Sequence, residues 1–177
     1  MLHIRPSLDA DIDPITAIYA HYVQNSTATF ETEVPSNLDM AARRADVLAK
    51  SLPYLVLTQQ SPSGEVVMGF AYANWFKPRA AYRFSCENSI YLHPSAGGKG
   101  WGKLLLAELL AQLERGGIRK VMAVIGGSEN RASIGLHSSL GFTRCGLVEN
   151  YGWKMGRWLD LVLMQRVLGA GSCSAPE

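Results

Sequence analysis

The sequence has few cysteines, little net charge and no long apolar run, and each shortage excludes a class of protein. The three cysteines, Cys86, Cys145 and Cys173, have no C-x-x-C spacing, so neither a zinc site nor a disulfide framework is indicated. A formal charge of +2 is too small to predict a nucleic-acid partner. No window is apolar enough for a membrane span, and the polar start lacks a signal-peptide core. We therefore expect a cytoplasmic protein without a membrane partner.

Composition and length favour one globular domain. Hydrophobic residues make up 47% of the chain and charged residues 18%, which is typical of a folded protein and unlike a disordered one. A chain of 177 residues can bury one sizeable core and is short for two. We expect a single domain over residues 1–168 and a flexible tail over residues 169–177.

Hydrophobic periodicity and turn residues predict a mixed α/β fold. Helices are expected from residue 11 or 13, from residue 37 to the Leu52-Pro53 pair, from residue 103 to Gly116-Gly117, and over residues 130–140. Strands are expected at residues 2–5, 54–58, 66–75, 84–92, 121–125 and 158–167, with another beginning at residue 142 and a turn at residues 61–64. This order predicts antiparallel hairpins first, crossover helices later, and parallel pairing only at the centre of the sheet.

The most informative segment is GKGWGK at residues 98–103, which follows a predicted strand and opens a predicted helix. Glycines adopt positive φ angles easily, so successive backbone N–H groups can converge on an anion, and the helix N-terminus adds partial positive charge. The segment therefore predicts a site for a diphosphate. Leu104 stands where a nucleotide-triphosphate loop needs Ser or Thr, and the spacing differs from the G-x-G-x-x-G dinucleotide motif.

Several segments together resemble the GCN5-related N-acetyltransferases (GNAT), whose acyl-CoA-binding core joins a strand, a glycine-rich loop and a helix to a later strand and helix. The second part of that core resembles the run from Asn130 through Leu136-His137 to Leu140-Gly141-Phe142. Within this family, the chain resembles the phosphinothricin and methionine sulfoximine acetyltransferase branch. The segments that carry this resemblance are Phe30-Glu31-Thr32-Glu33, Leu52-Pro53-Tyr54-Leu55-Val56, Ala71-Tyr72-Ala73, Lys77-Pro78-Arg79-Ala80-Ala81-Tyr82, Glu87-Asn88-Ser89-Ile90-Tyr91, Ala123-Val124-Ile125-Gly126 and Gly156-Arg157-Trp158-Leu159-Asp160. The resemblance implies an α/β fold with a central mixed sheet of about seven strands and helices on both faces.

The resemblance also implies acetyl-CoA as cosubstrate, with no metal. A strand edge would pair with the pantetheine amides, and the glycine loop would hold the pyrophosphate. The cofactor-binding residues it implies are Ile90, Tyr91, Leu92, Gly98, Lys99, Gly100, Trp101, Gly102, Lys103, Asn130 and Ser139. Asn130 is also an expected helix N-cap, and Ser139 is otherwise an exposed helix serine. Gly97 replaces the Gln or Arg of the family pattern Q/R-x-x-G-x-G/A, so we expect acetyl-CoA binding to survive with a more flexible loop.

Glu87 and His137 are the expected catalytic residues. Glu87 lies among apolar and aromatic neighbours, where desolvation raises a carboxylate pKa and suits it to take a proton from an ammonium group, directly or through water. Its alternative is an edge-strand glutamate in water or in an ion pair with Arg83. By the resemblance, His137 stands where many GNAT members carry the tyrosine that protonates the departing thiolate. Its alternative is a core histidine bonded to a carbonyl.

Acceptor binding is expected from segments that flank the amine entrance. The substrate-binding residues are Phe30, Trp75, Arg79, Tyr82, Glu87 and Asn88, with Lys77, Arg83 and Lys154 as further cations. The aromatic side chains would form a box, and the arginine would bind a carboxylate or phosphinate in a forked geometry. The alternative is that these aromatics belong to the core and the cations to a solvated loop.

These features predict an N-acetyltransferase that moves the acetyl group of acetyl-CoA directly to the α-amino group of phosphinothricin, methionine sulfoximine or methionine sulfone. The alternatives are acetylation of another amine, such as a protein N-terminus or an antibiotic, a non-catalytic acyl-CoA sensor, and a nucleotide-phosphate binder, which Leu104 disfavours. The family implies a homodimer, and Tyr151, Trp153 and Trp158 offer apolar surface for it.

Overall fold

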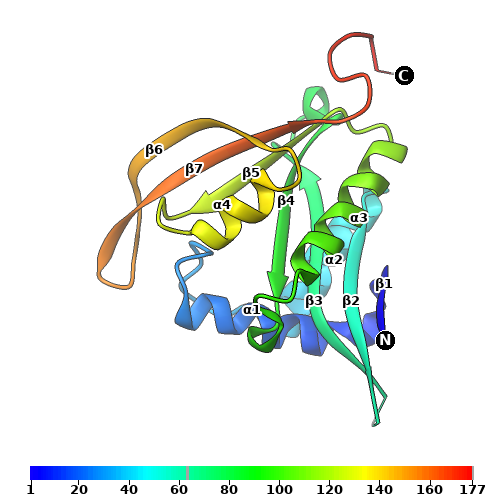
Figure 1. Ribbon diagram of the computed structural model, residues 1–177, viewed down its shortest axis with the longest axis vertical. Helices are drawn as coiled ribbons and strands as arrows, with labels where there is room; N and C mark the ends of the chain where they lie inside the picture. The colour runs from blue at the N-terminus through cyan, green and yellow to red at the C-terminus, as the bar shows by residue number, and fades with distance from the viewer. Residues whose placement is uncertain (63, 177) are drawn as a thin grey trace.

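A computed structural model describes residues 1–62 and 64–176, which form one seven-stranded mixed sheet with helices on both faces (Figure 1). The sheet order is β1-β2-β3-β4-β5-β7-β6. Its strands are β1 (Leu2–Pro6), β2 (Tyr54–Ser61), β3 (Gly64–Trp75), β4 (Ser85–Leu92), β5 (Lys120–Gly126), β6 (Thr143–Lys154) and β7 (Arg157–Val167). The α-helices are α1 (Ile12–Asn25), α2 (Asn37–Ala49), α3 (Trp101–Arg115) and α4 (Arg131–Ser138). The predicted fold class and element order are confirmed.

Helix boundaries follow from local capping. Ser36 caps α2 in a reciprocal arrangement, because its hydroxyl accepts from the Asp39 N–H while the Asp39 carboxylate accepts from the Ser36 N–H. Helix α3 begins at Trp101, two residues before the predicted start, because Gly100 takes a left-handed φ of 74° and serves as its N-cap. Helix α4 ends at Ser138, two residues earlier than predicted.

The sheet has one parallel pair, β4 with β5, at its centre, and the other described strand pairs are antiparallel. Strands β2 and β3 form the predicted hairpin, whose turn includes Ser63, outside the described residues. Helix α3 connects β4 to β5 as a crossover, which is the connection that a parallel pair requires. The prediction of central parallel pairing is confirmed.

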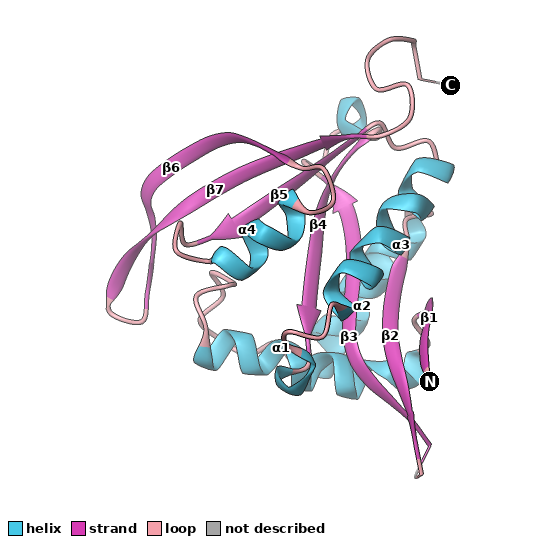
Figure 2. Ribbon diagram, viewed as in Figure 1, coloured by secondary structure: helices cyan, strands magenta, loops and turns pink. Residues whose placement is uncertain are grey.

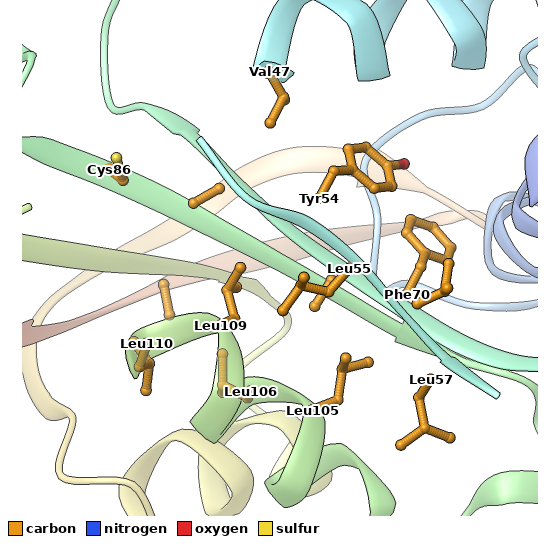
Figure 3. Packing of buried hydrophobic residues seen from close by; sticks show 14 of the residues in the cluster. Val47, Tyr54, Leu55, Leu57, Phe70, Cys86, Leu105, Leu106, Leu109 and Leu110 are labelled. Carbon is orange, nitrogen blue, oxygen red and sulfur yellow. The ribbon is translucent and has the colours of Figure 1, made fainter. Parts of the chain in front are cut away.

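The core has two layers, one on each face of the sheet (Figure 3). Val47 and Tyr54 lie on the face covered by α1 and α2. Leu55 and Leu57 point to the opposite face, toward the leucines of α3, among them Leu105. All five side chains are buried, so both helical layers are fixed by apolar packing on the sheet.

Strands β4 and β5 pair over a short distance and then diverge (Figure 2). Their pairing ends at Asn88 and Ala123, although the strands continue to Leu92 and Gly126. The divergence opens the centre of the sheet, so side chains from both faces can meet there. This opening positions the functional site.

The segment after β7 was expected to form a flexible tail. Residues 169–176 form turns after β7, with the Gly171 N–H bonded to the Leu168 carbonyl, and the mobility of this tail stays a prediction.

Within residues 1–62 and 64–176, no helix combines the length and apolarity needed to cross a bilayer. The same residues hold no group of three His, Cys, Asp or Glu side chains placed to bind a metal ion. Cys86, Cys145 and Cys173 are free thiols.

Candidate active site

A cavity of about 580 Å³ occupies the opening between β4 and β5. Thirteen predicted site residues line it: Phe30, Glu87, Asn88, Ile90, Tyr91, Leu92, Gly98, Gly100, Trp101, Gly102, Lys103, Asn130 and His137. Asn88 bonds His137 of α4 and so faces the layer of α3 and α4. Because side chains alternate along β4, Glu87 faces the layer of α1 and α2. The cavity therefore reaches through the sheet and brings groups from its two faces together.

The edge of β4 presents backbone groups to this opening. The His93 N–H bonds the Met68 carbonyl at 2.8 Å and the Phe76 N–H bonds the Ser85 carbonyl at 3.0 Å, which sets the alternation of the β3–β4 ladder. In that alternation Tyr91 directs its backbone groups toward β3, while the residues on either side of it, Ile90 and Leu92, direct theirs into the opening. Ile90 and Leu92 thus offer the strand edge that was predicted to pair with pantetheine.

The glycine loop forms a cradle with the geometry expected for an anion site. Gly98 and Gly100 have φ angles of 72° and 74°, and a Cβ at either position would meet no atom within 4 Å. A Cβ at Gly102 would lie 3.2 Å from Leu92 Cδ1, so this glycine allows the helix to approach β4. Lys103 lines the cavity beside the α3 N-terminus. Backbone donors, helix dipole and one lysine fit a pyrophosphate.

Lys99 differs from its neighbours in the loop, because it is not placed at the cavity where contact with the cofactor was predicted. Lys99 lies outside the described cavity lining, with its Nζ 4.6 Å from the centre of the Trp101 ring. The indole packs against the core and also lines the cavity. Gly97 has an ordinary φ of −61°, and a Cβ there would meet only the Pro94 carbonyl oxygen, at 3.8 Å. A side chain at residue 97 is therefore compatible with the backbone.

Glu87 lies in the cavity wall on the face of α1 and α2. Burial raises the pKa of Glu87, and the nearby Lys77 ammonium lowers it by a smaller amount. Arg83, the possible ion-pair partner, instead stacks its guanidinium 4.5 Å from the centre of the Phe84 ring. A carboxylate with a raised pKa at the wall of a cavity is suited to accept a proton.

His137 is buried on the opposite face and both of its ring nitrogens have partners. Nδ1 lies 2.8 Å from the Ser133 carbonyl oxygen, which requires a proton on Nδ1. Nε2 lies 3.0 Å from Asn88 Nδ2 and therefore accepts a hydrogen bond from it. Burial lowers the pKa of His137, and its bond to Ser133 raises that pKa by a smaller amount. The ring is thus neutral and orients Asn88, and its role as thiolate acid stays a prediction.

Residues 16–142 match the acetyltransferase (GNAT) family. The chain belongs to this family. It is 46% identical to a phosphinothricin N-acetyltransferase of Alcaligenes faecalis over 174 residues, which cover 98% of this chain and 86% of the relative. It is 39% identical to the L-methionine sulfoximine/L-methionine sulfone acetyltransferase of Pseudomonas aeruginosa over 164 residues, 92% of each chain. A crystal structure of a phosphinothricin acetyltransferase from Sinorhizobium meliloti in complex with acetyl-CoA superimposes with a TM-score of 0.94 at 44% identity, covering 99% of this chain and 93% of that one.

Helix α4 contributes to the GNAT cavity through its N-terminus. Asn130 accepts the Ser133 N–H at 3.2 Å, which confirms the predicted N-cap, and it also lines the cavity. Ser139 lies outside the described lining and donates its hydroxyl to the Leu136 carbonyl at 2.8 Å. Of the two α4 residues predicted to contact the cofactor, Asn130 is the one placed at the cavity.

The face of the cavity toward α1 and α2 includes residues that sequence reasoning missed. Tyr19, Thr29 and Tyr72 line it together with Phe30, and the Tyr19 and Thr29 hydroxyls are 2.9 Å apart. Tyr19 and Tyr22 are three residues apart in α1 and therefore share a helix face, but no local signal in the sequence indicates that this face covers the opening between β4 and β5.

Three predicted substrate residues lie away from the cavity. Trp75, Arg79 and Tyr82 are outside its described lining, at or beyond the end of β3. Strand β4 runs from that turn toward the opening, which begins only after Asn88, so the turn lies at the other end of the strand. Tyr82 packs edge-on against Phe76, with ring centres 5.8 Å apart. Their role in acceptor binding stays a prediction.

Proposed function

We propose that this GNAT enzyme transfers the acetyl group of acetyl-CoA to the α-amino group of a small amino acid analogue: phosphinothricin, methionine sulfoximine or methionine sulfone. The observation that carries the proposal is the cavity through the sheet, which joins the glycine cradle on one side to Glu87 on the other. The names of two relatives, at 46% and 39% identity, support this acceptor class.

The donor would be held by backbone groups. The N–H groups of residues 98–103 and the Lys103 ammonium suit the pyrophosphate, and the exposed edge at Ile90 and Leu92 suits the pantetheine amides. An N–H at this edge is also suited to bind the thioester oxygen as negative charge develops on it. Tyr22 donates its hydroxyl to the Leu92 carbonyl at 2.8 Å, which fixes the end of this edge.

Glu87 would act on the acceptor. An α-amine is mostly protonated at neutral pH and attacks a thioester only as the free amine. The Glu87 carboxylate, with its raised pKa, accepts the ammonium proton, directly or through water, and the lone pair then attacks the carbonyl carbon. The carbon–nitrogen bond forms as the carbon–sulfur bond breaks. The nitrogen then gives up a second proton to become the amide, and the departing thiolate takes up a proton and leaves as the free thiol of CoA. Lys77, whose charge lowers the pKa of Glu87, is the candidate cation for an anionic acceptor group. Arg79 stays a predicted second cation, although it lies outside the described cavity lining.

A panel assay tests the function. Release of free thiol from acetyl-CoA is measured with phosphinothricin, methionine sulfoximine, methionine sulfone, unmodified methionine, a peptide amine and an aminoglycoside. We expect the three analogues to have kcat/KM values at least tenfold above those of the other amines, because a site built for a tetrahedral polar group leaves its cations unpaired with methionine. Equal turnover of the peptide amine or the aminoglycoside would contradict the acceptor assignment. Tight acetyl-CoA binding without thiol release would favour the sensor.

We also propose a homodimer in the cytoplasm. Tyr151, Trp153, Met155 and Trp158 expose large apolar side chains on the β6–β7 hairpin, and the two indoles pack edge-on with ring centres 5.5 Å apart. The hairpin projects from the body of the molecule (Figure 1). Free cysteines suit a reducing compartment. Light scattering is expected to give twice the chain mass for the wild type and the chain mass for the Trp153→Ser/Trp158→Ser variant, whereas a monomeric wild type would contradict the proposal.

A further inference from the structure

Phe30 is wedged between two glycines on strands that flank β7. A Cβ built at Gly152 of β6 would lie 2.1 Å from Phe30 Cε1 and 2.3 Å from its Cδ1. A Cβ at Gly126 of β5 would lie 3.2 Å from Phe30 Cε2 and 2.6 Å from the Thr27 carbonyl oxygen. Nonbonded carbon atoms are normally about 3.5–4.0 Å apart, so the ring occupies space that any other residue at these positions would fill.

The glycine at position 152 is explained by this contact and not by its backbone. Gly152 is not among the glycines with a positive φ, so an alanine there meets no backbone strain. It pairs with Leu159 directly after a register shift between β6 and β7, where the strand bends. The absence of a side chain at position 152 therefore makes room for the Phe30 ring, which comes from a loop distant in sequence.

The loop that carries Phe30 is fixed from the same strand. Lys154, two residues after Gly152 and on the same side of β6, donates from its Nζ to the Thr29 carbonyl at 2.8 Å and to the Tyr22 carbonyl at 3.4 Å. Its side chain is buried in the described structure, so this ammonium holds the loop and is not available to an acceptor, contrary to its predicted role as a reserve cation. Alternation along β6 thus directs Gly152 and Lys154 to the loop.

The geometry points to Gly152 and Lys154 as residues that set acceptor specificity, by positioning Phe30 as a wall of the acceptor side of the cavity. Phe30 lines the cavity together with Gly126, but Gly152 and Lys154 are outside the described lining and act through the loop. This inference rests on the proposed acetyl transfer and names what limits the size of its acceptor. A group at position 152 displaces the ring away from β6. Gly126 bounds the ring on the side of β5, where even a Cβ would lie 3.2 Å from Phe30 Cε2, so the ring moves into the cavity.

Steady-state kinetics of Gly152→Ala test the inference. We expect the KM for methionine sulfone to rise on the order of tenfold, with the KM for acetyl-CoA within about twofold of the wild type, because the displaced ring intrudes only on the acceptor side. The rise should be smaller for an acceptor with a shorter side chain. Combining the change with Phe30→Ala, which removes all of the clashing ring atoms, should restore the methionine sulfone KM to that of Phe30→Ala alone. Gly135→Ala on α4, where a Cβ meets nothing within 4 Å, is the matched control.

A rise of both KM values together, or no relief in the double variant, would overturn the inference. Should Gly152→Ala fail to fold, Lys154→Met provides a second test, because it frees the loop without adding bulk beside the ring. We again expect a higher KM for methionine sulfone and a nearly unchanged KM for acetyl-CoA. Titration calorimetry of methionine sulfone into the CoA-saturated enzyme compares the acceptor affinity of the wild type and the variants without turnover. A wild type that binds methionine sulfone but does not acetylate it would refute the proposed function, and the binding constants would still decide the role of Gly152.

Discussion

Replacing Glu87 by glutamine lowers kcat for acetylation of the best acceptor by roughly a hundredfold or more, with the KM for acetyl-CoA nearly unchanged. The amide keeps the size and burial of the side chain but cannot accept the ammonium proton, and removal of a general base typically costs two or more orders of magnitude. Initial rates at saturating acetyl-CoA measure the effect. Turnover equal to the wild type would remove Glu87 from the mechanism.

The pH profile gives an independent reading of the same group. Activity needs ionised Glu87, so kcat/KM falls as pH drops through its pKa, and this acidic limb lies above that of an ordinary glutamate because burial raises the pKa. Lys77→Met removes the charge that lowers the pKa, so the limb moves to still higher pH. In Glu87→Gln the limb disappears. A limb that stays at the same pH in Lys77→Met would show that another group titrates.

Replacing His137 by phenylalanine lowers kcat by about tenfold or more and destabilises the fold by about 1–3 kcal/mol. Phenylalanine can keep the edge-on packing against Phe142, in which the ring centres are 4.9 Å apart, but it leaves the buried Asn88 Nδ2 without its partner. A buried polar group left unpaired costs about 1–3 kcal/mol. Thermal unfolding and turnover at saturating acetyl-CoA measure the two effects. Unchanged turnover would exclude a direct role in catalysis.

Glutamine at position 137 separates the two roles of the histidine. Its amide can donate to the Ser133 carbonyl and accept from Asn88, but it cannot supply a proton to the thiolate. Because the ring is neutral and both nitrogens are occupied, we expect His137→Gln to keep turnover within about threefold of the wild type. A loss as large as that of His137→Phe would instead identify the histidine as the acid.

The parts of this structure that local sequence determines were predictable. Ser36 indicates a helix start because its side chain can cap the first turn. The glycines at residues 98–102 indicate an anion site because they can adopt positive φ angles. Alternation and turn residues gave the β2–β3 hairpin. Each of these signals lies within a few residues of the feature it specifies, so no knowledge of tertiary packing was needed.

The acceptor side was not predictable from local signals, because it is assembled from distant segments. Tyr72 lines the cavity beside Thr29 and Phe30, and the fit of the ring depends on Gly152, more than a hundred residues away along the chain. Trp75 and Arg79 were expected to flank the amine entrance, but they lie outside the described cavity lining, at the end of β4 opposite the opening, and their part in acceptor binding stays a prediction. Where β4 and β5 separate is a property of the whole sheet.

Both faces of strand β6 have specific contacts, which limits where residues can be inserted into it or deleted from it. Tyr151 and Trp153 point outward, whereas Gly152 and Lys154 point to the loop that carries Phe30. Inserting or deleting a single residue in the segment paired with β7 would exchange the two sets, placing indole against the ring and lysine in solvent. The register shift just before Gly152 can absorb such a change, but the paired residues after it cannot. Relatives of this chain should therefore vary in length before Gly152 and hold a fixed spacing from there to the hairpin turn.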